Sequence, residues 1–167
     1  MTRRAALASI QPEKLAVSHL AHFVGLAANR RLVGELGRAG FGDLRESHGF
    51  LIQHLLAGPR SVGELARLLG ISQQAVSKTV AELTAGGYLE AEPADDARVR
   101  LVRLSERGQQ SVAAARRLRD ELERGLARRL GARRFAEARR LLVELLDELG
   151  GIAAVKARRV KSGDATR

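Results

Sequence analysis

The fold of this chain is decided by residues 61–108, which read SVGELARLLG ISQQAVSKTV AELTAGGYLE AEPADDARVR LVRLSERG. Two short stretches with apolar residues at helical spacing come first, and two stretches with strand-like alternation follow around a polar turn. This order predicts two helices joined by a tight turn and then a β-hairpin, which is the order of a helix-turn-helix with a β-wing.

The predicted helix pair carries its own start and stop signals. Ser61 is followed three residues later by Glu64, as in a capping box, and Gly70 suits the left-handed residue that ends the first helix. Ser72 then caps the second helix, which we expect to end at Gly86. The residues expected to face inward are Leu65, Leu68, Leu69, Val76, Val80 and Leu83.

The turn between the helices favours DNA binding. Helices that cross steeply need a small inner residue and a glycine in the turn, and Ala66, Gly70 and Val76 meet this spacing. Polar side chains then face outward at the amino end of the second helix. Glutamine pairs with adenine, serine serves bases or phosphates, and lysine suits phosphate. The alternative is a solvated helix surface rich in small polar groups.

The predicted wing places acidic residues beside an arginine. Its turn is centred on Asp95 and Asp96, just before Arg98. One interpretation is that Asp96 orients the Arg98 guanidinium for a minor groove. The other is an ordinary hairpin turn, because Asp favours turns. The full set of candidate DNA contacts is Ser61, Ser72, Gln73, Gln74, Ala75, Ser77, Lys78, Asp96, Arg98 and Arg100.

The motifs of this region give the chain a family resemblance. They are GPRSVGELA at 58–66, ISQQAVSK at 71–78, LTAGGYL at 83–89, and DAR at 96–98 followed by VRLSERG at 102–108. The chain resembles the MarR family of bacterial transcriptional regulators over about residues 15–150. The resemblance implies a mainly α fold with a small β-wing, in which the winged helix-turn-helix is flanked by N- and C-terminal dimerisation helices. It also implies that the second helix enters the major groove and Arg98 the minor groove.

Helical patterns precede the winged region, which we place at residues 58–108. Residues 12–57 predict two supporting helices, the first reaching about Arg38. Asp43 and Glu46 resemble a capping box at the start of the second. Residues 1–11 are expected to be an N-terminal arm.

Residues 109–155 predict further helices, interrupted at Gly131, and 156–167 a flexible basic tail. These outer helices cannot bury their apolar stripes against so small a module. A homodimer built from both ends of the chain is therefore favoured over a monomeric helical core. Arginines on the C-terminal helices either attract the duplex or form a solvated face; they are Arg116, Arg117, Arg128, Arg129, Arg133 and Arg134.

Composition excludes several other classes of protein. The chain has no cysteine, and no apolar run approaches the roughly 20 residues that span a bilayer. No phosphate-binding glycine loop or Ser-His-Asp constellation indicates an enzyme, so no cofactor is expected. The net charge of +10 favours nucleic acid, yet residues 61–110 carry 6 basic and 7 acidic side chains. A cytoplasmic protein without membrane contact is the simplest expectation.

The resemblance also implies that DNA is released when a small phenolic or anionic effector enters a cleft between the dimer and DNA-binding regions. The candidate lining is His22, Arg45 and His48. His19 and His22 have a spacing that permits a metal, but no acidic cluster accompanies them, and ordinary packing is favoured.

Two functions follow from the sequence. The first is a sequence-specific regulator that binds double-stranded DNA, as a homodimeric repressor on a palindromic operator, with release by a small ligand. The alternative is a winged-helix module that binds proteins without reading DNA.

Overall fold

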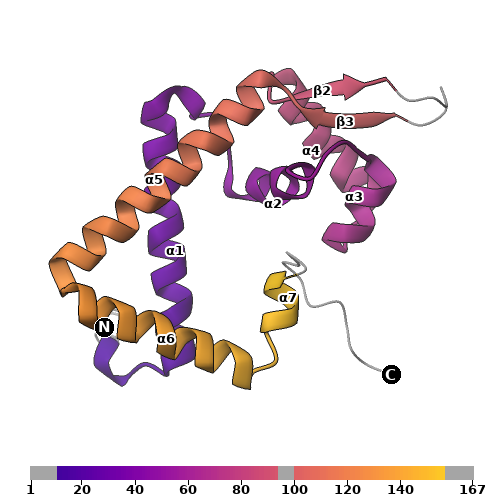
Figure 1. Ribbon diagram of the computed structural model, residues 1–167. Helices are drawn as coiled ribbons and strands as arrows, with labels where there is room; N and C mark the ends of the chain where they lie inside the picture. Colours follow the sequence, from indigo (N-terminus) through magenta and orange to yellow (C-terminus); the bar gives the residue numbers. More distant parts are fainter. Residues whose placement is uncertain (1–10, 94–99, 157–167) are drawn as a thin grey trace, which may run out of the picture.

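The computed structural model describes residues 11–93 and 100–156 (Figure 1). Within these ranges the chain is mainly helical with one small antiparallel sheet, as the sequence predicts. The elements in order are η1 (Pro12–Lys14), α1 (Val17–Leu36), η2 (Gly37–Phe41), α2 (Glu46–Leu55), β1 (Arg60–Ser61), α3 (Val62–Leu69), α4 (Gln73–Ala85), β2 (Leu89–Glu92), β3 (Leu101–Leu104), α5 (Glu106–Leu130), α6 (Ala132–Glu148) and α7 (Ile152–Lys156).

The elements divide into two groups in space (Figure 1). Helices α2, α3 and α4 and the sheet form a compact group, which we call the head. Helices α1, α5 and α6 form a second group, which we call the frame, with α1 packed against α5 and α6 following it. Because α5 begins directly after β3, the head and the frame are joined by one continuous helix.

The core lies in the head. Its most deeply buried side chains are Leu51, Leu65, Val76, Leu83 and Tyr88, contributed by α2, α3, α4 and the residue before β2. The predicted inward face is confirmed for these helices, with Leu69 also buried and Val80 partly so. Leu68 is the exception, since 38% of it is exposed. The buried face of α3 is formed by Leu65, Ala66 and Leu69 instead.

The predicted capping signals are confirmed for α3 and wrong for α2. Ser61 and Glu64 form the expected capping box, and Gly70 has φ 66° at the end of α3. Helix α2 instead begins after Arg45, whose backbone N–H donates to Nδ1 of His48 at 3.2 Å. Asp43 does not cap this helix because its carboxylate is bonded to distant side chains, described below.

The first helix also differs from its prediction. A 3-10 turn ends at Lys14, and the extended backbone at Leu15 delays α1 until Val17. At the other end α1 runs into a π turn, within which Gly40 has φ 93°, a conformation that favours glycine. The first helix therefore ends at Leu36, close to the predicted end at about Arg38.

The frame leaves large apolar side chains uncovered. On α1 these are Val17, Phe23, Val24 and Leu26, and on α6 Leu141, Leu142 and Val143, each at least 40% exposed. A helix is held in a globular protein mainly by burying its apolar face. The frame therefore presents surfaces that the single chain does not cover. Among the described helices, none is long and apolar enough to cross a bilayer.

Candidate nucleic-acid interface

Helices α3 and α4 meet through a three-residue turn with the expected geometry. Gly70 adopts a left-handed conformation, and the N–H of Ile71 donates to the Ala66 carbonyl at 3.2 Å. Ala66 is 6% exposed at the contact between the helices, and Val76 is fully buried from the α4 side. These three positions fix the angle between α3 and α4, so the structure confirms the helix-turn-helix.

The amino end of α4 presents a polar surface. Gln73, Gln74, Ser77 and Lys78 are exposed, and so is the methyl group of Ala75. Gln73 leans back toward α3, since its amide nitrogen lies 3.6 Å from where a Cβ on Gly63 would stand. Gln74, Ser77 and Lys78 therefore form the outer row of the helix.

Two of the predicted contact residues are helix caps. The hydroxyl oxygen of Ser72 accepts from the N–H of Ala75 at 3.2 Å. The Ser61 hydroxyl accepts from the N–H of Glu64 at 3.2 Å and donates to the Glu64 carboxylate at 3.0 Å. The Ser61 backbone N–H and then the Ser61 hydroxyl hold the pKa of Glu64 below its usual value. Ser61 is therefore engaged in the cap, whereas Ser72 retains its hydroxyl proton at an exposed helix amino end.

The sheet of the wing has the order β1-β3-β2. β2 and β3 pair antiparallel, with Leu89 opposite Leu104 and Glu92 opposite Leu101. The third strand, β1, pairs Arg60 with Val102 and was not predicted. Two residues are too few to show alternation, and only the pairing with β3 defines them as a strand.

The arginines of the wing strands differ in their partners. Arg103 lies between Glu90 and Glu92, at 2.8 and 2.6 Å, and is thereby neutralised within the wing. Arg100 is exposed beside the wing turn. Asp96 and Arg98 lie outside the described residues.

A three-residue cluster joins the head to the first turn of α5. The Tyr88 hydroxyl donates to the Asp43 carboxylate, and Arg107 reaches both, at 3.3 Å from Asp43 and 3.1 Å from the Tyr88 oxygen. The hydrogen bond from Tyr88 is the main reason that the pKa of Asp43 lies below its ordinary value. Burial, followed by the bond to Asp43, raises the pKa of Tyr88. Sequence reasoning missed this cluster, because its members are far apart along the chain.

A second cluster holds α4 against α2. Glu82 of α4 is bonded to the Arg45 guanidinium and lies 3.4 Å from Nε2 of buried His48. Because Nδ1 of His48 accepts from a backbone N–H, Nε2 carries the hydrogen and faces Glu82. Two of the three candidate pocket residues, Arg45 and His48, thus both contact the Glu82 carboxylate. His22 lies apart on α1, exposed and edge-on to Phe23.

A cavity of about 190 Å³ lies between α1, α2 and α5. Arg45 lines it together with apolar side chains that include Val33, Leu36 and Ile52, and Arg116 and Arg119 line its α5 side. This cavity lies between the frame and the head, which is the place where the effector cleft is predicted. Within the described residues, no group of three or more His, Asp or Glu side chains could hold a metal ion.

The other arginines of the C-terminal helices lie far from α4. Arg128, Arg129, Arg133 and Arg134 surround the junction of α5 and α6, at the opposite end of α5 from the head (Figure 1). Arg133 is also paired with Glu137 at 2.9 Å. These four arginines cannot touch a duplex that lies directly on α4 of the same chain.

Comparison with known proteins agrees with this geometry. Residues 44–98 match the model of the MarR family. A search of curated proteins found no match. MepR, a transcription regulator of the Staphylococcus aureus multidrug efflux pump MepA, is 19% identical with a TM-score of 0.67, over 81% of this chain and 99% of that one.

Two further solved structures have the same fold. A MarR variant from E. coli is 22% identical with a TM-score of 0.63, over 79% of this chain and 97% of that one. A variant of S. aureus MepR bound to an oligodeoxyribonucleotide is 20% identical with a TM-score of 0.58, over 81% and 99%. The family match at residues 44–98 and the shared fold confirm the predicted resemblance: the winged helix-turn-helix of this chain is similar to that of MarR-family regulators.

Proposed function

We propose that this protein is a sequence-specific DNA-binding transcription regulator that acts as a homodimeric repressor on a palindromic operator. The observation that carries the proposal is the exposed polar row on α4, held on a buried Val76 and Leu83. A helix anchored on one face and polar on the other can lie in a major groove without disturbing its own packing. The family match supports a regulator rather than an enzyme.

We propose that the outer row of α4, formed by Gln74, Ser77 and Lys78, contacts the DNA. Gln74 has an amide that can pair with both N6 and N7 of an adenine, and Ser77 can serve a base or a phosphate. Lys78 supplies a positive charge to the backbone. The exposed amino end of α4, capped by Ser72, adds N–H groups and the positive end of the helix dipole.

Phosphate attraction must rest on few groups, because several cations in and beside the head are already paired with carboxylates. Arg103 is paired within the wing, Arg107 with Asp43, and Arg45 with Glu82. Among the described residues of the head, Lys78, Arg67 and Arg100 are the exposed cations without such a partner. We propose that Arg98 adds a contact in the minor groove, with Asp96 orienting its guanidinium.

The uncovered apolar side chains of α1 and α6 support a homodimer. A second copy would cover them and would carry a second α4, so that two half-sites are read by one molecule. A palindromic operator follows from that symmetry. The absence of a membrane-spanning helix among the described residues agrees with the proposed cytoplasmic location.

The cavity between α1, α2 and α5 is the proposed effector site. Its apolar walls suit an aromatic ring, and Arg45, Arg116 and Arg119 suit a phenolic or anionic group. An anion bound there would compete with Glu82 for Arg45, which would loosen α4 from α2. Ligand binding would in this way lower the affinity of the protein for DNA.

Selection of bound sequences from random duplexes by the full chain tests the proposal. We expect an enriched palindrome whose half-sites are about one helical turn apart. Gln74→Ala should reduce discrimination at one base pair of each half-site by about tenfold or more. The matched control is Thr84→Ala, exposed at the other end of the same helix.

The same selection separates the two functions. Arg98→Ala should weaken binding to the selected operator and leave dimerisation unchanged. Failure to enrich any sequence, with no salt-dependent binding to any duplex, would contradict the regulator. The acidic balance of residues 61–110 would then favour the alternative, a winged-helix module that binds proteins without reading DNA.

A further inference from the structure

The chain passes between the frame and the head at two places (Figure 1). It enters the head after α1, through residues 37–45, and it leaves the head after β3, at Ser105, which caps α5. The Arg107 side chain reaches from the second passage to the first. Its Nη2 atom lies 3.4 Å from the Gly40 carbonyl oxygen and 3.3 Å from the Asp43 carboxylate. Arg107 therefore ties the two passages together.

Tyr88 gives this contact a fixed point within the head. Its ring is buried under the Arg107 guanidinium, and its hydroxyl donates to Asp43. Its backbone is held as well, because the N–H of Ser105 donates to the Tyr88 carbonyl at 3.0 Å. We call Gly40, Asp43, Tyr88 and Arg107 the joint. It connects the head to both helices of the frame that adjoin the head.

The carboxyl end of α4 rests on the joint. Gly86 follows Ala85, the last residue of α4. A Cβ on Gly86 would stand 3.0 Å from the Tyr88 ring and 3.1 Å from the Asp43 carboxylate, closer than an ordinary van der Waals contact. From Ala85 back to Gln74 the helix rises about 16.5 Å, at roughly 1.5 Å per residue. A rotation of about 10° at the joint would therefore move Gln74 by about 3 Å, close to the roughly 3.4 Å between base pairs.

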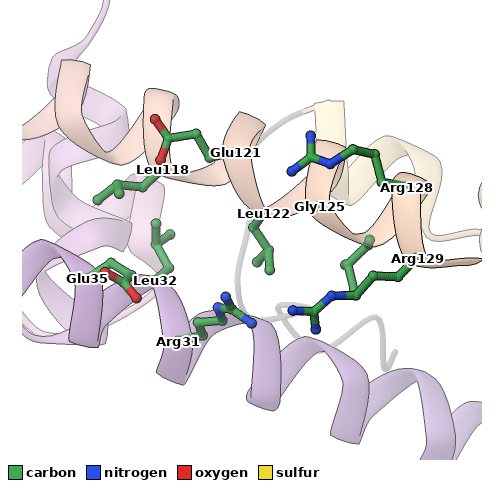
Figure 2. Close-up of a pocket in the computed structure, with 10 residues that line it drawn as sticks. Arg31, Leu32, Glu35, Leu118, Glu121, Leu122, Gly125, Arg128 and Arg129 are labelled. Carbon is green, nitrogen blue, oxygen red and sulfur yellow. The ribbon is translucent and has the colours of Figure 1, made fainter.

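The frame side of the joint is held together by packing between helices. Helix α1 leads to Gly40, α5 starts beside Arg107, and the two helices lie against each other. Figure 2 shows Leu32 of α1 on the side that faces Leu118 and Leu122 of α5, around a cavity of about 340 Å³ between the helices. The head is thus set against a pair of packed helices, and the joint determines its angle to both.

We propose that Arg107 is a positioning residue for DNA recognition. It fixes the angle between the head and the frame, and thereby the half-site spacing that the two α4 helices of a dimer accept. The inference rests on the proposed homodimeric, DNA-binding function. The Arg107 side chain is 45% exposed and lies outside the core of the head. Its loss would therefore leave the fold of the head intact and release the angle.

The distance between the two α4 helices tests the proposal without DNA. The chain has no cysteine, so Gln74→Cys, at an exposed position, accepts one spin label per subunit. We expect a narrow distribution of distances between the two labels, and an increase in its width of about 3 Å or more when Arg107→Gln is added. The matched control is Arg117→Gln, an exposed arginine of α5 that is paired with Glu121 at 3.8 Å.

The accepted spacing of half-sites tests the consequence for recognition, on protein without the label. Duplexes carry the selected half-sites at the preferred spacing or one base pair longer or shorter, and a further duplex carries a single half-site. Arg107→Gln should lower the discrimination between spacings by at least about threefold, since partly exposed hydrogen bonds to a charged group are lost. Its affinity for the single half-site should be unchanged. Asp43→Asn should act in the same direction, and Arg117→Gln should match the wild type.

Three results would overturn the proposal. Equal label distributions in Arg107→Gln and Arg117→Gln would mean that the joint does not fix the angle. A broader distribution with unchanged discrimination between spacings would mean that recognition does not depend on the angle. An equal loss of affinity on every duplex, the single half-site included, would give Arg107 a purely structural role. Failure of the proposed function looks different, because the wild type itself would then bind no duplex or give no distance between labels, and the inference would fall with it.

Discussion

The guanidinium of Arg107 lies 4.7 Å from the centre of the Tyr88 ring, and its Nη2 donates to the Tyr88 hydroxyl at 3.1 Å. Tyr88 is the one tyrosine of the chain and is 1% exposed, between α4 and β2. Arg107 belongs to the first turn of α5. This pair, with Asp43, therefore connects the helix that we expect to read DNA with the frame that we expect to form the dimer.

Removal of the Tyr88 hydroxyl should loosen this connection without opening a cavity. Tyr88→Phe leaves the ring under Arg107 and removes the donor to Asp43. We expect a loss of about 1–2 kcal/mol in the free energy of unfolding, since one partner is left without its bond. Urea denaturation at neutral pH measures it. An unchanged midpoint would mean that the cluster does not stabilise the fold.

The acidic member of the cluster predicts a pH dependence. The Tyr88 hydrogen bond holds the pKa of Asp43 below its ordinary value of 3.8, so the charged carboxylate stabilises the fold at neutral pH. That stabilisation is lost as the pH falls through the lowered pKa. Asp43→Asn should therefore lower the unfolding midpoint at pH 7, and the difference from the wild type should shrink below pH 3.8. A difference that stayed constant with pH would contradict the assignment.

Gly108 is required by close packing against the same tyrosine. A Cβ at this position would stand 2.2 Å from the Tyr88 carbonyl oxygen. Gly108→Ala should therefore destabilise the protein by about 1–3 kcal/mol. The matched control is Gly34→Ala on α1, where nothing lies within 4 Å of the new Cβ, and where we expect a small gain. Thermal denaturation of both variants checks the contrast, and equal losses would contradict it.

The sequence predicted the features of the head that depend on neighbours along the chain. Ser61 with Glu64, Gly70 and Ser72 are local signals, and each acts in the structure as expected. Val76 and Leu83 follow from helical periodicity alone. The outer row of α4 then follows by exclusion, because the remaining positions of the helix must face solvent.

The features that the sequence did not predict depend on contacts between distant residues. Asp43 has the local pattern of a cap, but Tyr88 and Arg107 bond to its carboxylate across the fold. His48, with no cap pattern, accepts the N–H of Arg45 instead. Arg103 is neutralised because the register places Glu90 opposite it and Glu92 lies beside it. Such partners are set by tertiary packing, which local spacing does not encode.

The two described arginines at the wing give a matched pair of variants. Arg100→Ala should weaken operator binding, because Arg100 is exposed beside the wing turn and free to meet phosphate. Arg103→Ala should change operator affinity less, because Glu90 and Glu92 already neutralise this side chain. Fluorescence anisotropy at one fixed salt concentration compares them. A larger loss for Arg103→Ala would contradict the proposed role of Arg100.

The central claim, that α4 of each subunit lies on DNA, is tested most directly by the salt dependence of operator binding. For the full chain and its Lys78→Gln variant, the slope of log affinity against log salt should differ by about 1.8, at roughly 0.9 per lost phosphate contact in each of two subunits. The Thr84→Ala control should keep the wild-type slope. Identical slopes for wild type and Lys78→Gln would contradict the account.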